Sequence, residues 1–194
     1  MPNLTTKILA AAFLALSSNA ALAHTGHGAS GLAAGLAHPF SGFDHTLAML
    51  AVGLWAAQNG RGRLWLLPAA FMITLAAGAC TSMIWQHPLP ALEAGIALSV
   101  LALGLMIAFF VQLPIWQNMT IIAPFGLLHG YAHGLELPQS ATPAAYILGF
   151  LAATTVLHLT GIAASTVFRQ KPVALATIAG GSIAMSGFGL LAFS

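Results

Sequence analysis

Three ionisable side chains stand at helical spacing within the otherwise apolar stretch APFGLLHGYAHGLELP, residues 123–138. His129, His133 and Glu136 are four and three residues apart, so on a helix they share one stripe about 60° wide. Each such group costs about 2.5–3.5 kcal/mol at the centre of a membrane helix. Two imidazoles and a carboxylate kept together at that cost indicate a binding site. Hydrogen bonds that join neighbouring helices are the alternative interpretation.

A second polar set lies near the start of the chain in HPFSGFDH, residues 38–45. His38 and His45 are seven residues apart and therefore lie on one face of a helix. Asp44 does not fit that face, because an unbroken helix places it about 100° from His45. Either it holds an imidazole through a hydrogen bond, or a break at Pro39–Gly42 turns it inward. A carboxylate that caps a helix is the remaining interpretation.

The types of ligand indicate which ion such a site would take. Imidazole with carboxylate suits borderline divalent ions such as Ni²⁺, Co²⁺ and Zn²⁺, whereas Cu(I) prefers thiolate and thioether. A site open to the outside fits passage better than storage, since a transported ion must bind well enough to enter and weakly enough to leave. The candidate ligands are His38, Asp44, His45, His129, His133 and Glu136.

Four further residues are weaker candidates. His158 lies about 15 residues into the fifth apolar segment and is either a deeper imidazole along an inward path or a hydrogen-bonded packing residue. Glu93 lies near the outer end of the third segment, where an acidic side chain also favours the helix dipole. His24 and His27 either bind a divalent metal weakly, with His24 as a new amino terminus, or belong to a flexible tail.

The composition places the chain in a membrane. Of its 194 residues, 59% are hydrophobic and 4% are charged, whereas a soluble domain carries about 25% charged residues. Five basic residues and a net charge of +2 are too few and too scattered for a nucleic-acid-binding surface. The single cysteine, Cys80, excludes an intrachain disulfide and a thiolate cluster within one chain.

The polar side chains need helices to position them, and the sequence predicts six. Each apolar segment provides about 20 residues of helix, enough to cross about 30 Å of hydrocarbon. The predicted fold is all-α, a polytopic six-helix transmembrane bundle that forms one domain, residues 24–194. Its segments are 30–58, 64–85, 91–112, 119–137, 143–168 and 172–193.

Residues 1–23 are predicted to be a cleavable signal peptide. Lys7, the apolar run ILAAAFLAL and the ending ALA at residues 21–23 follow the secretory pattern; an uncleaved first anchor is the alternative. The mature amino terminus then lies in the periplasm and the chain in a bacterial inner membrane. All basic residues of the mature chain then fall in cytoplasmic loops, as the positive-inside rule requires: Arg61, Arg63, Arg169 and Lys171.

Two features of the predicted helices bear on the site. The first segment has 29 residues, about 43 Å of helix, so a break or a short re-entrant piece is expected at Pro39–Gly42. Gly126, Gly130 and Gly134 form a stripe beside the histidines that lets a neighbouring backbone approach, so we expect the ligands to project into a tight helix–helix seam. Because the first segment runs inward and the fourth outward, the two polar sets can meet in the outer half of the membrane.

At these residues the chain resembles the HupE/UreJ family of nickel/cobalt permeases. HPFSGFDH matches the family's HPxxGxDH motif and HGYAHGLE its HGxAHGxE-like motif, both complete, and the resemblance covers nearly the whole mature chain. It implies uptake of Ni²⁺ or Co²⁺, usually for hydrogenase, urease or cobalamin synthesis, with the metal as transported substrate and no organic cofactor. The sequence holds no nucleotide-binding motif, which favours a facilitator or secondary permease over an ATP-driven pump.

Two other functions could use the same histidines. Paired intramembrane imidazoles permit a bis-histidine haem protein that carries electrons, although Asp44 and Glu136 suit a divalent cation better. A membrane metalloenzyme with Glu136 as base is also permitted. The sequence shows no evident nucleophile or set of oxyanion donors for such a reaction, so an enzyme is not expected.

Overall fold

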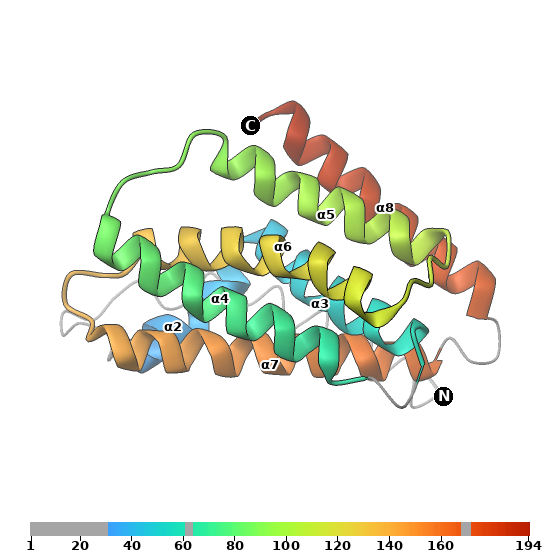
Figure 1. Ribbon diagram of the computed structural model, residues 1–194, viewed down its shortest axis with the longest axis horizontal. Helices are drawn as coiled ribbons and strands as arrows, with labels where there is room; N and C mark the ends of the chain where they lie inside the picture. The colour runs from blue at the N-terminus through green and yellow to red at the C-terminus, as the bar shows by residue number, and fades with distance from the viewer. Residues whose placement is uncertain (1–30, 61–63, 168–171) are drawn as a thin grey trace, which may run out of the picture.

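The computed structural model describes residues 31–60, 64–167 and 172–194, and within these ranges every regular element is a helix (Figure 1). The helices are α2 (Gly31–Ser41), α3 (Phe43–Gln58), α4 (Leu66–Trp85), α5 (Leu92–Ala108), α6 (Ile115–Leu135), α7 (Pro143–Val167) and α8 (Pro172–Ala192). The all-α prediction is therefore confirmed for the described part of the chain. The predicted signal peptide and several named residues lie outside the described residues: His24, His27, Arg61, Arg63, Arg169 and Lys171.

Each of the six predicted apolar segments coincides with a helix or, for the first, with two. Among the described residues, three helices, α4, α7 and α8, are long and apolar enough to cross a membrane. α5 is shorter than these three helices, at 17 residues. α6 is more polar, because it contains Asn118, His129 and His133, all of which are buried. Large apolar side chains such as Ile84 and Phe109 are exposed on the outside of the bundle, a surface that suits hydrocarbon rather than water. The fold is that of a helical membrane protein, and the count of six spans stays a prediction.

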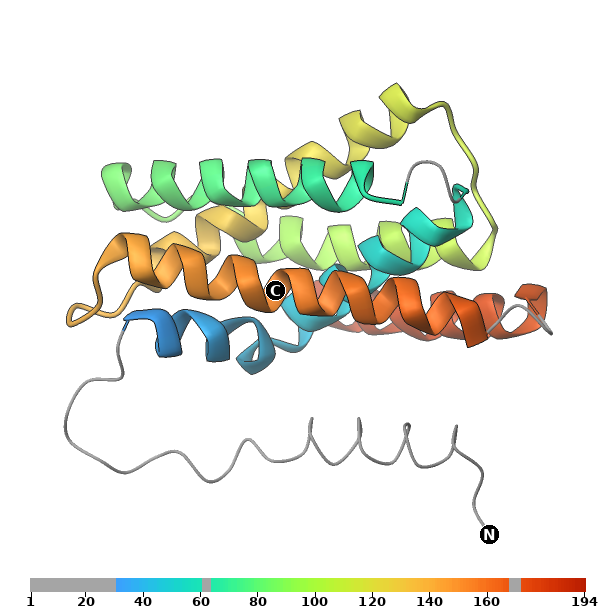
Figure 2. The ribbon, with the colours of Figure 1, turned by 90° about the horizontal axis from the view of Figure 1, so that it is seen from below.

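The predicted break in the first segment lies at Gly42, between α2 and α3. Gly42 has an extended backbone (φ −97°, ψ 118°), and Figure 2 shows that the chain changes direction there. The Thr46 hydroxyl donates to the carbonyl oxygen of Pro39 at 2.8 Å, and the Ser41 hydroxyl donates to that of His38 at 2.6 Å. Side-chain hydroxyls thus satisfy carbonyl groups near the bend, as a break at membrane depth requires.

The glycine stripe of α6 packs directly against the backbone of α4. A Cβ atom built on Gly126, Gly130 or Gly134 would overlap the backbone of α4, at Phe71, Leu75 and Ala79 respectively. The residue numbers of the three contacts increase together along α4 and α6, so the two helices run parallel (Figure 1). The predicted close approach is confirmed, and it fixes the rotation of α6 about its own axis.

Glycines also join the other helices in pairs. On α7, Gly149 contacts the backbone of α2 at Leu32, and Gly161 contacts that of α3 at Leu50. The same kind of contact joins α5 and α8 through Gly104, and Figure 1 shows these two helices side by side along one edge of the bundle. Close backbone packing through small residues is the usual way to hold helices together in lipid.

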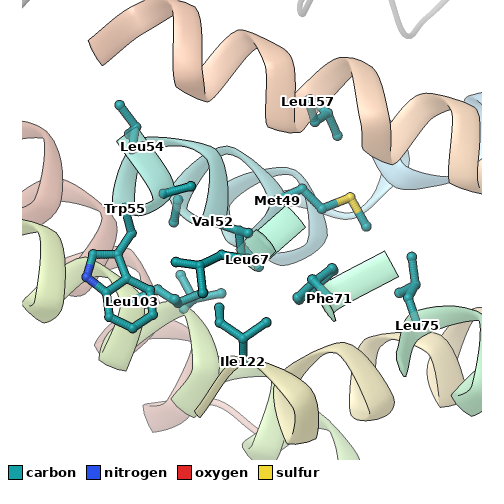
Figure 3. Close-up of a cluster of buried hydrophobic side chains, with 14 of the residues drawn as sticks. Met49, Val52, Leu54, Trp55, Leu67, Phe71, Leu75, Leu103, Ile122 and Leu157 are labelled. Atoms are coloured by element: carbon teal, nitrogen blue, oxygen red, sulfur yellow. The ribbon is translucent and has the colours of Figure 1, made fainter. Parts of the chain in front are cut away.

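A cluster of buried apolar side chains, here named the apolar core, fills the bundle next to the later turns of α3 (Figure 3). Val52, Phe71 and Ile122 are fully buried within it. At its far end the indole Nε1 of Trp55 donates to the carbonyl oxygen of Val111 at 2.9 Å. Asp44, His45 and Thr46 lie in the first turn of α3, so the apolar core begins directly where this polar set ends.

Candidate metal-binding site

The structure brings together the histidines of the two predicted sets. The ring of His133 lies 4.7 Å from that of His38 and 4.6 Å from that of His45, measured between ring centroids. The ring of His129 lies 5.0 Å from that of His45. Four imidazoles from α2, α3 and α6 therefore form one continuous group, here named the histidine cluster, although the two sets are far apart in sequence.

Two members of the histidine cluster have one ring nitrogen fixed and the other free. His45 Nδ1 lies 2.7 Å from Asp44 Oδ1, and His129 Nδ1 donates to the carbonyl oxygen of Phe125 at 2.9 Å. The Nε2 atoms of both rings are buried and have no hydrogen-bond partner within the described residues. A carboxylate or carbonyl on one imidazole nitrogen is the arrangement that orients metal-ligating histidines and raises their basicity. Both Nε2 atoms are therefore candidate metal ligands.

His133 occupies the middle of the cluster. Its side chain is fully buried and stacks on the ring of Phe150, with centroids 5.0 Å apart and planes 9° from parallel. Neither of its ring nitrogens has a partner among the residues that the structure describes. Burying a polar group without a hydrogen bond is unfavourable by about 1–3 kcal/mol, so a bound cation would remove a penalty that the folded protein otherwise carries.

A cavity of about 280 Å³ opens beside the cluster and gives it access from the protein surface. All three acidic residues of the chain, Asp44, Glu93 and Glu136, line this cavity. Its other lining residues are His38, Ser41, Gly42, His45 and Ala132. Three carboxylates in one cleft attract cations and raise their local concentration.

At the mouth of the cavity, Glu136 Oε2 lies 2.7 Å from His38 Nε2. The Glu136 side chain is 58% exposed, whereas that of His38 is 20% exposed, so the carboxylate faces the surface and the imidazole faces inward. This pair connects the end of α6 to α2. It also engages His38, so a cation that uses this nitrogen must displace the carboxylate.

The side chains form a series of donors rather than a closed cage. Within the described ranges, no group of three His, Cys, Asp or Glu side chains is arranged to hold a metal ion. The donors instead lead from the exposed Glu136 through the cavity to the buried His129. An open series of this kind suits an ion that moves.

Local structure explains how these side chains are aimed. The glycine stripe holds one face of α6 against α4, and the neighbouring face carries His129 and His133 toward α2 and α3. His133 is fully buried between helices, as the expectation of a helix–helix seam requires. The helices around its ring are α2, α3 and α7, and not the α4 that contacts the glycine stripe. The stripe and the histidines are one residue out of step, and one residue turns a helix by about 100°.

Gly42 makes room for the pair formed by Asp44 and His45. A Cβ atom on Gly42 would lie 2.9 Å from Asp44 Oδ1 and 3.0 Å from His45 Nδ1. Asp44 therefore serves as the hydrogen-bonding partner of an imidazole, one of the three interpretations that the sequence left open. Asp44 stands in the first turn of α3. Its Oδ1 also accepts from the backbone N–H of His45, at 2.7 Å.

The weaker candidates separate into two groups. Glu93 lines the acidic cavity together with Asp44 and Glu136. His158 lies apart from the cluster, with its ring 5.5 Å from that of Phe71. Sequence reasoning missed the aromatic residues that frame the cluster, Phe71, Tyr146 and Phe150. An aromatic side chain in an apolar helix gives no signal that separates a role at a site from ordinary packing.

The chain was compared with known proteins. The model of the family described as HupE / UreJ protein matches residues 11–190, which is most of the chain. The chain belongs to the HupE/UreJ family. Within this family, protein HupE of Rhizobium leguminosarum bv. viciae is 45% identical over 170 residues, which cover 87% of this chain and 88% of that protein. No solved structure matches the chain. The membership in the HupE/UreJ family that the two sequence motifs indicated is therefore confirmed.

Proposed function

We propose that this chain imports Ni²⁺ or Co²⁺ across a bacterial inner membrane, as a facilitator or secondary permease. The observation that carries the proposal concerns the rings of His45 and His129, in each of which Nδ1 is held by a hydrogen bond and Nε2 has no partner within the described residues. The two rings lie beside a cavity that is lined by all three acidic side chains of the chain. The HupE/UreJ family is associated with nickel and cobalt uptake, which agrees with this donor set.

The first step is capture in the acidic cavity. Asp44, Glu93 and Glu136 attract a hydrated divalent cation through their combined negative charge. Oxygen ligands hold Ni²⁺ and Co²⁺ less firmly than imidazole does, so the ion is not trapped there. As the cation approaches, Glu136 turns from His38 toward the ion, and the imidazole becomes available.

The second step is transfer from oxygen to nitrogen ligands. The Nε2 atoms of His45 and His129 and both nitrogens of His133 are buried and unpaired in the described structure. They replace part of the hydration shell of the ion without introducing fixed charge into the membrane. Neutral imidazoles are cheaper to bury than charged side chains, and the divalent charge of the ion offsets the nearby carboxylates.

The spacing of the rings argues against a haem. In a bis-histidine haem protein, the two axial imidazoles stand on opposite faces of the macrocycle. Three pairs of rings in the cluster are 4.6–5.0 Å apart and contact one another edge to face. The rings of His38 and His45 are 6.4 Å apart, but the ring of His133 lies within 4.7 Å of both, which leaves no space for a macrocycle between them. The same histidines therefore fit a small cation better.

The test is uptake of radioactive Ni²⁺ and Co²⁺ into proteoliposomes that contain the full chain. We expect His45→Ala and His129→Ala each to lower uptake at least about tenfold, since even the loss of a group that only orients a ligand lowers metal affinity or activity by about 10–100-fold. His87→Ala is the matched control, because His87 is exposed and, within the described structure, forms a hydrogen bond through its backbone carbonyl, which accepts from the Tyr131 hydroxyl and is kept in the variant. Uptake by either cluster variant at the rate of His87→Ala would remove the cluster from the mechanism.

A further inference from the structure

One buried imidazole lies beyond the histidine cluster and is not used by the proposed capture and transfer steps. His158 on α7 is 1% exposed, and neither of its ring nitrogens has a hydrogen-bond partner in the described part of the chain. A packing histidine normally satisfies at least one nitrogen, because buried polar groups are paired. His158 therefore has donor capacity that the fold itself does not use.

Phe71 connects this residue to the cluster. Its ring centroid lies 5.7 Å from that of His129 and 5.5 Å from that of His158, and the latter contact is edge to face, at 81°. Phe71 is fully buried and belongs to the apolar core shown in Figure 3. The single aromatic ring thus contacts the innermost member of the cluster and the isolated imidazole.

Two further donors lie on the same seam between α3 and α7. Thr154 is one helical turn before His158, so the two side chains share a face of α7. The Thr154 hydroxyl donates to Met49 Sδ at 3.2 Å, and both residues are fully buried. The seam is tight, because a Cβ atom on Gly53 would overlap the carbonyl oxygen of His158. The Met49 thioether and the Thr154 hydroxyl are therefore in contact where α3 and α7 meet, and the His158 imidazole stands one turn further along the same face of α7.

We propose that His158, with Met49 and Thr154, forms a second and inner binding station for the transported cation, and that Phe71 is the partition between this station and His129. Imidazole and thioether suit borderline to soft cations. All three carboxylates of the chain line the outer cavity, so the inner donors are neutral. Neutral donors hold a divalent cation less tightly than the outer set does, which favours release toward the inner side. This inference rests on the proposed import function and extends it.

The test uses the full chain and separates binding at the outer site from passage. In detergent, equilibrium binding of Ni²⁺ to His158→Ala is expected to keep the affinity of the outer site within about twofold of wild type, because His158 lies outside the cluster. In proteoliposomes, uptake by the same variant is expected to fall at least about tenfold. His158→Met supplies a thioether at the same position and is expected to recover part of the uptake.

The partition is tested with Phe71→Ala. Because the inner station holds the cation less tightly than the outer site does, it stays empty in wild type at a Ni²⁺ concentration that just saturates the outer site. Removal of the ring leaves room for a cation beside His158, so at that concentration Phe71→Ala is expected to bind one more equivalent of Ni²⁺ than wild type does. The double variant Phe71→Ala/His158→Ala is expected to lose that equivalent. Its persistence in the double variant would overturn the inner station.

The result for uptake distinguishes the two proposals. Uptake that is lost in His129→Ala and kept at the wild-type rate in His158→Ala overturns the inner station alone. A wild-type protein that neither binds nor imports Ni²⁺ or Co²⁺ overturns the import function and the inner station together. Loss of uptake in His158→Ala, with outer binding intact and partial recovery in His158→Met, supports the inner station.

Discussion

The substitution Asp44→Asn removes one charge from the site while it keeps the shape of the side chain. Asp44 Oδ1 accepts from the backbone N–H of His45 and lies 2.7 Å from Nδ1 of the same residue. An asparagine can still accept through its own Oδ1, so the ring of His45 is expected to stay in place. What changes is the negative charge behind the imidazole, and with it the basicity of Nε2.

The size of the effect follows from the distance between the carboxylate and the ion. The 2.7 Å contact, the width of the imidazole ring and a metal–nitrogen bond of about 2.1 Å place a cation on Nε2 about 7 Å from the carboxylate. A charge of −1 and a charge of +2 at that distance attract each other by about 1 kcal/mol in water and about 5 kcal/mol at an effective dielectric constant of 20. The Asp44 side chain is 19% exposed and lines the open acidic cavity, where water screens the attraction, so the lower half of this range applies. We expect about 2 kcal/mol, which is about thirtyfold weaker binding.

Calorimetric titration of Ni²⁺ into the detergent-purified protein measures this change directly, with Glu93→Gln as the matched control. Glu93 lines the same cavity, and the control removes an equal charge, but no contact of Glu93 with an imidazole is found in the described structure. Its effect is expected to stay below about fivefold, since only the general attraction of the cavity is reduced. If Asp44→Asn and Glu93→Gln weaken binding equally, Asp44 acts only through the field of the cavity and the reasoning about His45 is wrong.

Two further predictions concern glycines that the structure places in contact with other atoms. Gly130→Ala puts a methyl group into the backbone of α4 at Leu75. We expect overpacking to lower the stability by about 1–3 kcal/mol, which is measured as a lower midpoint of thermal unfolding in detergent. Gly181→Ala is the control, because a Cβ atom there meets nothing within 4 Å, and it should unfold like wild type. Gly42→Ala displaces the Asp44–His45 pair. It is expected to weaken Ni²⁺ binding about tenfold with little change in the midpoint of thermal unfolding. Unchanged affinity for Ni²⁺ would show that the pair can shift without effect on the ligands.

Helical periodicity was enough to predict which polar residues share a stripe, but not how the stripes meet. The spacing of His129 and His133 fixed their common face, and the glycine stripe next to them predicted a close helix neighbour. The length of the first segment predicted the break, which lies at Gly42. Placing His38 and His45 on one helical face was a poorer guide, because the two residues stand on separate helices and meet at a bend.

Other parts of the site have no signal in a single sequence. The pairing of Glu136 with His38 depends on how the end of α6 meets α2, a contact between residues nearly 100 positions apart. Phe71 and Phe150 frame the imidazoles, yet each is one more apolar residue in an apolar helix. The count of six spans is likewise harder to test, because α6 carries the polar ligands that lower its hydropathy.

The arrangement of ligands over the helices has a consequence for binding. Close glycine contacts hold α6 against α4, and others hold α7 against α2 and α3. His129 and His133 belong to the first of these units, whereas His38 and His45 belong to the second. A cation bound between the histidines therefore joins the two units, and any displacement of one against the other changes the distances of all four imidazoles. A ligand shifts an equilibrium between two conformations only by the difference in its affinity for them. Because the four imidazoles are divided between the two units, the affinity for the ion depends on how the units are placed, and ion binding can favour one conformation of the bundle over another.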